Sequence, residues 1–327
     1  MTDRVRAVSL PATDPPSGGR TLLVASLAGE LAAPISADAS ALARAIRARH
    51  GAAIASIAFY GSCLRRGTSE GVHDFYAIVD DYRSAYRSRA LAAANALLPP
   101  NVFYLELGGG VAPLRAKYAV VSSADLARAC RGETRRSGLW ARFAQPVAAP
   151  FVRDAAARDA LAAACADAVC TALHAGIAAR AQGWPRADAA ALWCEIFRAT
   201  YAAELRPERE GASDSIYADA PARFDARFDE AISALIASGA IERGGDGALR
   251  ARAPIARVYG RSAAAKWIGL LQLLKTAATF GDWVPYALWK VERHSGVHLE
   301  ASERQRRHPF VFGWPVLFRA WRSGALR

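Results

Sequence analysis

The stretch ASIAFYGSCLRRGTSEGVHDFYAIVDD, residues 55–81, decides how the first part of the chain folds. It opens with a short apolar run that ends in Gly61-Ser62, passes through a polar loop containing glycine, and continues into a second apolar run from His73. Short β-branched and aromatic runs bounded by Gly and Ser are typical of buried strands joined by turns. The pattern predicts two strands of one sheet, with Gly61-Ser62 at the end of the first.

Further elements surround these two strands. A helical pattern at 36–51 precedes them, another at 82–98 follows, and apolar runs at 101–107 and 116–122 flank a Gly-Gly-Gly turn. Strands alternating with helices indicate a compact sheet-containing unit. We predict an α+β chain whose first domain occupies residues 23–150.

From residue 151 the pattern becomes mostly helical, in alanine-rich windows. The helical run 228–239 is followed by two short segments around Gly245-Asp246-Gly247, which is a hairpin signal. A helix followed by a hairpin predicts a mostly α, winged-helix-like domain over residues 151–260.

The last segment, residues 261–327, differs in composition from the rest. It holds five of the eight tryptophans, and its eleven Lys and Arg against four Asp and Glu supply +7 of the chain's net charge of +12. Leu270, Leu273 and Leu274 follow helical spacing, so an amphipathic helical tail is expected. Tryptophan and basic residues together favour contact with an anionic membrane surface. The alternative is a helix packed on the body of the protein with a solvated basic face.

Composition limits the remaining possibilities. A pI near 9.9 implies an anionic partner. Residues 1–22 contain acids, prolines and glycines where a signal peptide needs an apolar stretch, so we expect a disordered leader and a cytoplasmic protein. Charged residues and prolines interrupt every window of roughly 18 to 20 apolar residues, so no membrane-spanning helix is expected. The five cysteines are scattered, without metal-ligand spacing, and Cys165 and Cys170 are expected in the core.

The sharpest chemical signal is Tyr60-Gly61-Ser62 at a strand end, followed by Asp74 at the start of the next strand. In a polymerase-β-like nucleotidyltransferase, backbone N–H groups and a serine hydroxyl bind triphosphate oxygens, and a carboxylate on the adjacent strand holds Mg²⁺ against the same phosphates. Taken alone, the same spacing would also arise by chance from an ordinary turn followed by a solvent-facing acid at a strand end.

A second metal ligand is not obvious. The same-face neighbours of Asp74 on an extended strand are Val72 and Tyr76. Asp80 and Asp81 lie six and seven residues on, roughly 20 Å along the strand, which is too far for a shared ion. Glu106, late on the apolar run 101–107, which we expect to be the neighbouring strand, is the better candidate for a second metal ligand, with a surface acid as the alternative.

These motifs, in this order, resemble the mitochondrial-type CDP-diacylglycerol synthases, the translocator assembly and maintenance family. AFYGS at 58–62 and HDFYAIVDD at 73–81 resemble the family's Tyr-Gly-Ser strand end and single-Asp strand, and NVFYLE resembles its next strand. Further matches are LRAKYAVVS at 114–122, GLWARFAQPV at 138–147, EIFRATYAAELR at 195–206 and the run 270–296. Ala119, Gln145 and Ala203 depart from the family pattern, and Glu204 replaces its aspartate.

The resemblance implies a CTP:phosphatidate cytidylyltransferase, peripheral on the inner face of the cell membrane. Gly61 and Ser62 would contact CTP phosphates, Asp74 would hold Mg²⁺, and Lys117 would neutralise phosphate charge. Arg206 would meet a phosphate from the second domain, although a salt bridge with Glu204 or Glu208 is an equal alternative. His73 is expected to face away from Asp74, because neighbouring strand residues point to opposite faces.

Two other functions remain open. One is a nucleotidyltransferase acting on a different small-molecule or protein acceptor. The other is a winged-helix nucleic-acid binder, although helix 228–239 is acidic and apolar, so no nucleic-acid partner is expected. The sequence fixes neither the nucleotide, nor the acyl preference, nor the oligomeric state.

Overall fold

The computed structural model describes residues 18–108, 113–134, 138–185, 188–203, 213–252, 275 and 302–307. Arg206 and nearly all of the expected tail lie outside these residues. Within them, the chain combines helices with a mixed five-stranded sheet, which confirms the α+β class.

The sheet is the centre of the fold. Its strands, in the spatial order β3-β4-β2-β1-β5, are β3 (Asn101–Leu107), β4 (Leu114–Ser122), β2 (Val72–Val79), β1 (Ile54–Tyr60) and β5 (Val147–Val152). β2 and β4 are parallel, and the other neighbours are antiparallel. The four predicted strands are therefore present. β5 was not predicted, because Pro146 and Pro150 interrupt its apolar run, and as an edge strand it tolerates proline.

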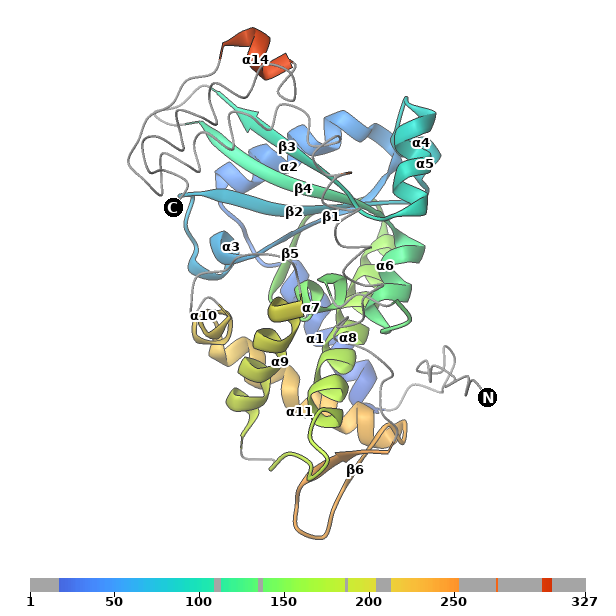
Figure 1. Ribbon diagram of the computed structural model, residues 1–327, viewed down its shortest axis with the longest axis vertical. Coiled ribbons are helices and arrows are strands. Elements are labelled where there is room, and N and C mark those ends of the chain that lie inside the picture. Colours follow the sequence, from blue (N-terminus) through green and yellow to red (C-terminus); the bar gives the residue numbers. More distant parts are fainter. Residues whose placement is uncertain are drawn as a thin grey trace.

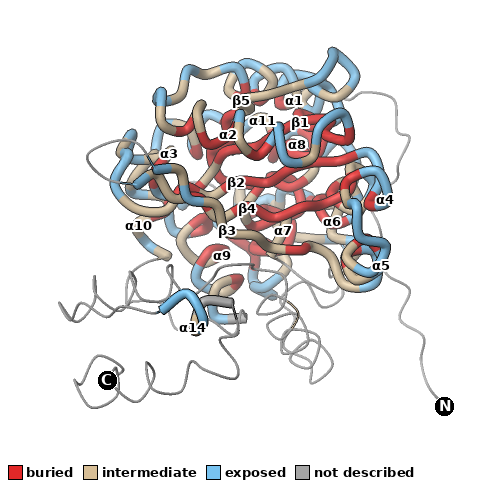
Figure 2. The backbone as a smooth tube through the Cα atoms, turned by 90° about the horizontal axis from the view of Figure 1, so that it is seen from above, coloured by how far each residue is buried: buried red, intermediate tan, exposed pale blue. Residues whose placement is uncertain are grey.

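Helices cover both faces of the sheet (Figure 1). On one face, α2 (Ala37–His50) buries Leu42 and Ile46 against strand residues that include Ile57 and Phe75. On the other face lie α6 (Ser123–Cys130), α7 (Gly138–Phe143) and α8 (Ala155–Ala178). The central strands are consequently buried on both sides, as the continuous red of the tube in Figure 2 shows.

The helical layer below the sheet is built around α8. It also contains α1 (Gly18–Leu31), α9 (Ala189–Ala203), α10 (Asp214–Ala218) and α11 (Pro221–Ala237), followed by the hairpin β6 (Ile241–Arg243) and β7 (Leu249–Ala251). The predicted helix and hairpin are confirmed. The shorter elements are η1 (Gly51–Ala53), α3 (Ser62–Arg66), α4 (Tyr82–Ala85), α5 (Arg89–Leu97) and α14 (Glu303–Arg307).

Residues 18–22, which we expected within the leader, belong to α1, because this helix begins at Gly18. Leu23, Leu27 and Leu31 recur every four residues and bury one side of α1. This helix packs on α8 and α11 (Figure 1), so it belongs to the helical layer and not to the sheet unit that follows it in sequence. One hydrophobic core joins the helical layer to a face of the sheet.

α8 is the one described helix long and apolar enough, by length and composition, to cross a membrane. We did not predict this helix as a candidate membrane span, because Arg158, Asp159 and Asp167 interrupt its apolar run. Most of its apolar window, 83%, is buried inside the protein, which is typical of a core helix. Cys165 and Cys170 are buried in it, as predicted.

Candidate functional site

A row of side chains crosses the sheet at the end of β1. Tyr60 pairs with Asp74 across β1 and β2, Asp74 pairs with Lys117 across β2 and β4, and Lys117 pairs with Tyr104 across β4 and β3. Residues directly opposite one another on paired strands project to the same face. The register therefore brings three predicted site residues, Tyr60, Asp74 and Lys117, onto one face of adjacent strands.

Gly61 lies directly against the Asp74 carboxylate. Its φ is +89°, a conformation that favours glycine, and a Cβ built at this position would lie 3.1 Å from Asp74 Oδ2. Two independent features thus require glycine here. The close approach brings the Gly61-Ser62 backbone to the metal-binding candidate, as the spacing predicted.

Lys117 forms an ion pair with Asp74, with 3.4 Å between Nζ and Oδ1. The two side chains are 21% and 28% exposed, so both are accessible to a ligand. A cation and a carboxylate at adjacent strand positions can bind a phosphate and a phosphate-bound metal side by side. The parallel pairing of β2 with β4, which creates this contact, is not visible in the spacing of Asp74 and Lys117 along the chain.

Tyr60 has a packing role. Its ring lies 5.2 Å from the ring of Tyr76, and burial, with Tyr76 and Asp74 nearby, raises its pKa well above the usual value of 10.0. The hydroxyl therefore stays protonated at neutral pH. Arg142 from α7 opposes this rise in pKa, so a further cation lies close to the row.

Glu106 is not brought to Asp74. We expected β3 to neighbour β2, but β4 lies between them, so two strand spacings, about 10 Å, separate β3 from β2. Glu106 instead forms an ion pair with Arg115 at 3.1 Å and accepts a hydrogen bond of 2.6 Å from the Tyr104 hydroxyl. These contacts fit a surface acid better than a ligand to the same ion.

Asp80 and Asp81 lie at the far end of β2, as the residue count indicated. Asp80 forms an ion pair with Arg153, and Asp81 caps α4. His73 faces the opposite side of the sheet from Asp74, where it is buried and its ring lies 5.6 Å from that of Phe59. None of the three approaches the row.

The row offers one protein carboxylate, that of Asp74, as a ligand to magnesium. The described residues contain no cluster of three or more His, Cys, Asp and Glu side chains suited to holding a metal. Asp74 alone would bind free Mg²⁺ weakly. Mg²⁺ usually keeps water and phosphate ligands and takes only one or two protein carboxylates, so Asp74 suits an ion that is already bound to phosphates. The residues fit nucleotide-bound magnesium.

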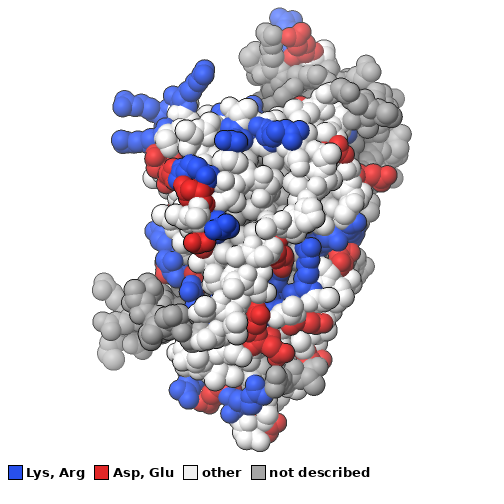
Figure 3. Space-filling view, turned by 180° about the vertical axis from the view of Figure 1, so that it is seen from behind, with Lys and Arg blue, Asp and Glu red and all other residues white. Residues whose placement is uncertain are grey.

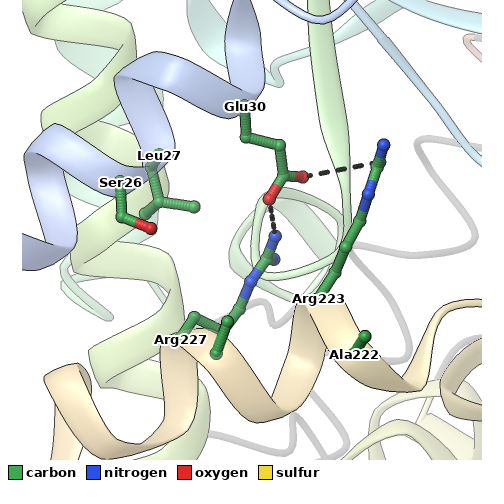
Figure 4. Close-up of a pocket in the computed structure, with 7 residues that line it drawn as sticks. Ser26, Leu27, Glu30, Ala222, Arg223 and Arg227 are labelled. Carbon is green, nitrogen blue, oxygen red and sulfur yellow. Dashed lines mark hydrogen bonds and ion pairs between the residues drawn. The ribbon is translucent and has the colours of Figure 1, made fainter.

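A hollow of about 250 Å³ lies elsewhere, between α1 and α11 (Figure 4). Glu30 forms ion pairs there with Arg227 and, at 3.8 Å, with Arg223, and Arg227 donates a hydrogen bond of 2.8 Å to the Ala144 carbonyl. Arg227 is buried, so its ion pair with Glu30 lies at the bottom of the hollow. Together with the hydrogen bond to Ala144, this ion pair connects α1 and α11 with the segment before β5.

Two sequence predictions fall outside the described residues: Arg206, and the tail apart from Lys275 and 302–307. Lys275 donates hydrogen bonds to the carbonyls of Leu98 and, at 2.9 Å, Pro100. Lys275 therefore contacts the loop between α5 and β3.

No protein family and no curated protein matches the chain at a meaningful level of similarity.

Proposed function

We propose that the chain is a nucleotidyltransferase, and specifically a CTP:phosphatidate cytidylyltransferase that makes CDP-diacylglycerol and pyrophosphate at a membrane surface. The observation that carries this proposal is the Asp74 carboxylate held between the Gly61 backbone and the Lys117 ammonium. The proposal also assigns a polymerase-β-like fold to the first domain and a winged-helix-like fold to the second.

The side chains of the row suit phosphoryl chemistry. In the proposed complex, Gly61 and Ser62 bind triphosphate oxygens, and Lys117 neutralises phosphate charge. Asp74 holds the nucleotide's Mg²⁺, which would supply charge neutralisation at the α-phosphate when bound. Positioning and charge stabilisation carry such reactions, so no further protein group has to form a covalent bond.

The proposed reaction balances without a strong base. A phosphate oxygen of phosphatidate forms a bond to the α-phosphorus of CTP, while the bond from that phosphorus to the bridging oxygen of the β-phosphate breaks. Pyrophosphate leaves with the bonding electron pair. The nucleophile is already an anion, which agrees with the position of His73 on the other face of the sheet.

The lipid substrate gives the tail a role. We place the protein on the inner face of the cell membrane, with residues 261–327 binding an anionic surface through tryptophan and basic side chains. Each basic residue near such a surface contributes about 1 kcal/mol before salt screening.

The nucleic-acid alternative receives less support. α11, the helix before the hairpin, buries Phe224, Arg227 and Phe228, and its exposed side carries Asp225 and Asp229. Those carboxylates would repel a phosphate backbone.

The deciding experiment is an assay of the purified protein with Mg²⁺, phosphatidate vesicles and each of the four ribonucleoside triphosphates. We expect CDP-diacylglycerol from CTP. Nucleotidyl transfer to a soluble acceptor, with none to phosphatidate, would favour the alternative acceptor. Absence of both nucleotide binding and turnover would reject the nucleotidyltransferase class.

A further inference from the structure

Two arginines of α3 meet a single carboxylate from the helical layer. Arg65 Nε lies 3.3 Å from Asp219 Oδ2, and Arg66 Nε lies 3.2 Å from each oxygen of the same carboxylate. Asp219 is 154 residues beyond Arg65 in sequence. α3 follows Gly61 directly, so these contacts join the helical layer to the Gly-Ser turn, which we define as residues 60–62.

Arg65 is held on a second side. Its side chain is only 6% exposed, and its Nη1 donates a hydrogen bond of 2.8 Å to Gln145 Oε1. The buried Gln145 donates in turn to the Ala141 carbonyl at 3.0 Å and to the Tyr201 hydroxyl at 3.3 Å. Arg65 thus connects α3 with α7 and α9 as well as with Asp219.

Asp219 is itself well fixed. It lies at the end of α10, where its N–H donates to the Ser215 carbonyl at 2.9 Å, and α11 begins two residues later with Pro221. On the other side of α3, the buried Cys63 packs toward the start of β2, with Sγ 3.5 Å from the Val72 carbonyl. α3 is therefore anchored to the sheet on one side and to the helical layer on the other.

The charges at this contact are unequal. One carboxylate faces two guanidinium groups, so a net positive charge remains next to the Gly-Ser turn. Exposed ion pairs contribute little, but Arg65 is almost fully buried, and removing the partner of a buried charge is far more disruptive. The contact should consequently restrain α3 more than a surface salt bridge would.

We propose that Asp219 is a positioning residue for nucleotide binding, which acts through Arg65 and Arg66 to hold α3, and with it the Gly-Ser turn, against Asp74. This inference rests on the proposed nucleotidyltransferase function. It assigns the helical layer an indirect influence on the phosphate-binding turn, through the ion pairs of Asp219 with the two arginines of α3.

The test uses Asp219→Asn, with Asp219→Glu as the conservative variant and Asp214→Asn as the matched control. Asp214 also lies on α10 and pairs with an arginine, Arg198, at 2.8 Å, but both partners are exposed. Two quantities are measured on the full chain: amide hydrogen exchange of residues 61–67 without nucleotide, and the affinity for Mg·CTP by titration.

We expect Asp219→Asn to increase exchange in residues 61–67 by about tenfold or more, because opening of that segment is no longer restrained. Affinity for Mg·CTP should fall several-fold in the same variant. Asp219→Glu should recover most of both properties, and Asp214→Asn should match the parent protein.

Unchanged exchange in Asp219→Asn overturns the proposal, whatever the nucleotide result. Increased exchange with unchanged affinity for Mg·CTP overturns it as well, since the restraint would then not serve nucleotide binding. If the parent protein binds no nucleotide, the proposed function fails and the positioning role fails with it, while the exchange result still shows whether Asp219 restrains α3.

Discussion

At the scale of single residues, Asp74 is the side chain on which the proposed chemistry depends. Asp74→Asn keeps the shape and removes the charge, so turnover should fall at least about a hundredfold, as expected for loss of a metal-mediated electrostatic interaction. The matched control is Asp80→Asn, which directly follows the same strand and is paired with Arg153. Steady-state assays and thermal melting of both variants check this. Equal activity in Asp74→Asn and parent would remove Asp74 from the site.

Gly61 allows a second comparison at this scale. Gly61→Ala and Gly67→Ala both place alanine at a positive φ, +89° and +62°. The left-handed helical conformation of Gly67 costs alanine about 1–2 kcal/mol of stability, whereas Gly61, with a ψ of −168°, lies in a region almost restricted to glycine, so its cost is larger. Only at Gly61 does the new methyl group approach Asp74, since nothing lies within 4 Å at Gly67. We expect both variants to lose stability in denaturant unfolding, Gly61→Ala more than Gly67→Ala, but turnover to be lost in Gly61→Ala alone. Loss of turnover in both variants would attribute the effect to backbone strain and not to the contact with Asp74.

His73 should govern part of the acid sensitivity. Burial lowers its pKa below the usual 6.5, although the hydrogen bond with the Arg115 carbonyl opposes the shift. Below pH 6.5 the unfolded chain therefore binds more protons than the folded one, so the free energy of unfolding decreases as pH falls. His73→Phe should reduce this decrease, measured by urea unfolding at about pH 7.5 and about pH 5.5, and leave turnover near the parent value. An unchanged pH dependence, or lost turnover at neutral pH, would contradict this.

At the scale of elements, the strands nearest the site were predictable, but the order in which they pair in the sheet was not. Local alternation and the Gly-Ser boundary specify β1 and β2, and the isolated Lys117 in an apolar run marks β4. Parallel pairing joins segments about forty residues apart and leaves no local signal. The ion pair of Asp74 with Lys117, the separation of Glu106 from Asp74 and the contact of Arg65 with Asp219 all depend on such pairing or packing.

The same limit applies to α1, whose partners are distant in sequence. Gly19 packs against α11 so closely that an added Cβ would lie 2.9 Å from the Ala234 backbone nitrogen. Gly19→Ala should therefore destabilise the protein by about 1–3 kcal/mol through overpacking. Gly29→Ala is the control on the same helix, where nothing lies within 4 Å, and it should stabilise by about 0.5–1 kcal/mol. Thermal unfolding would distinguish the pair, and a stabilising Gly19→Ala would contradict the packing of α1 on α11.

At the scale of the whole molecule, the distribution of positive charge indicates which surfaces could bind an anionic membrane. Basic side chains gather at the upper left of Figure 3, over the α4–α5 end of the sheet, where Arg83, Arg87 and Arg89 are exposed. This end of β2 is opposite to Asp74. The basic tail and this arginine group are therefore two candidate surfaces for an anionic membrane.

Deleting residues 261–327 should abolish binding to anionic vesicles and lipid-dependent turnover, while Mg·CTP binding remains measurable. Replacing Arg83, Arg87 and Arg89 together by serine should leave Mg·CTP binding unchanged, because the group lies at the end of β2 opposite to Asp74. Loss of vesicle binding in this variant would assign the membrane contact to the arginine group in place of the tail. Vesicle co-sedimentation at rising salt, melting and nucleotide titration check both variants. Vesicle binding retained after the deletion, or a collapsed melting transition, would reject the membrane role of the tail.

The packing of α1 on α11 also has a consequence during protein synthesis. Glu30 and Arg227 are 197 residues apart, and a ribosome adds about 5–20 residues per second. The leucine stripe of α1 therefore leaves the ribosome about 10–40 s before its partner helix exists, and the sheet is translated in the interval. α1 can pack on α8 once that helix has been translated, but its contact with α11 has to wait until α11 emerges. The first of the described helices therefore completes its packing only late in synthesis.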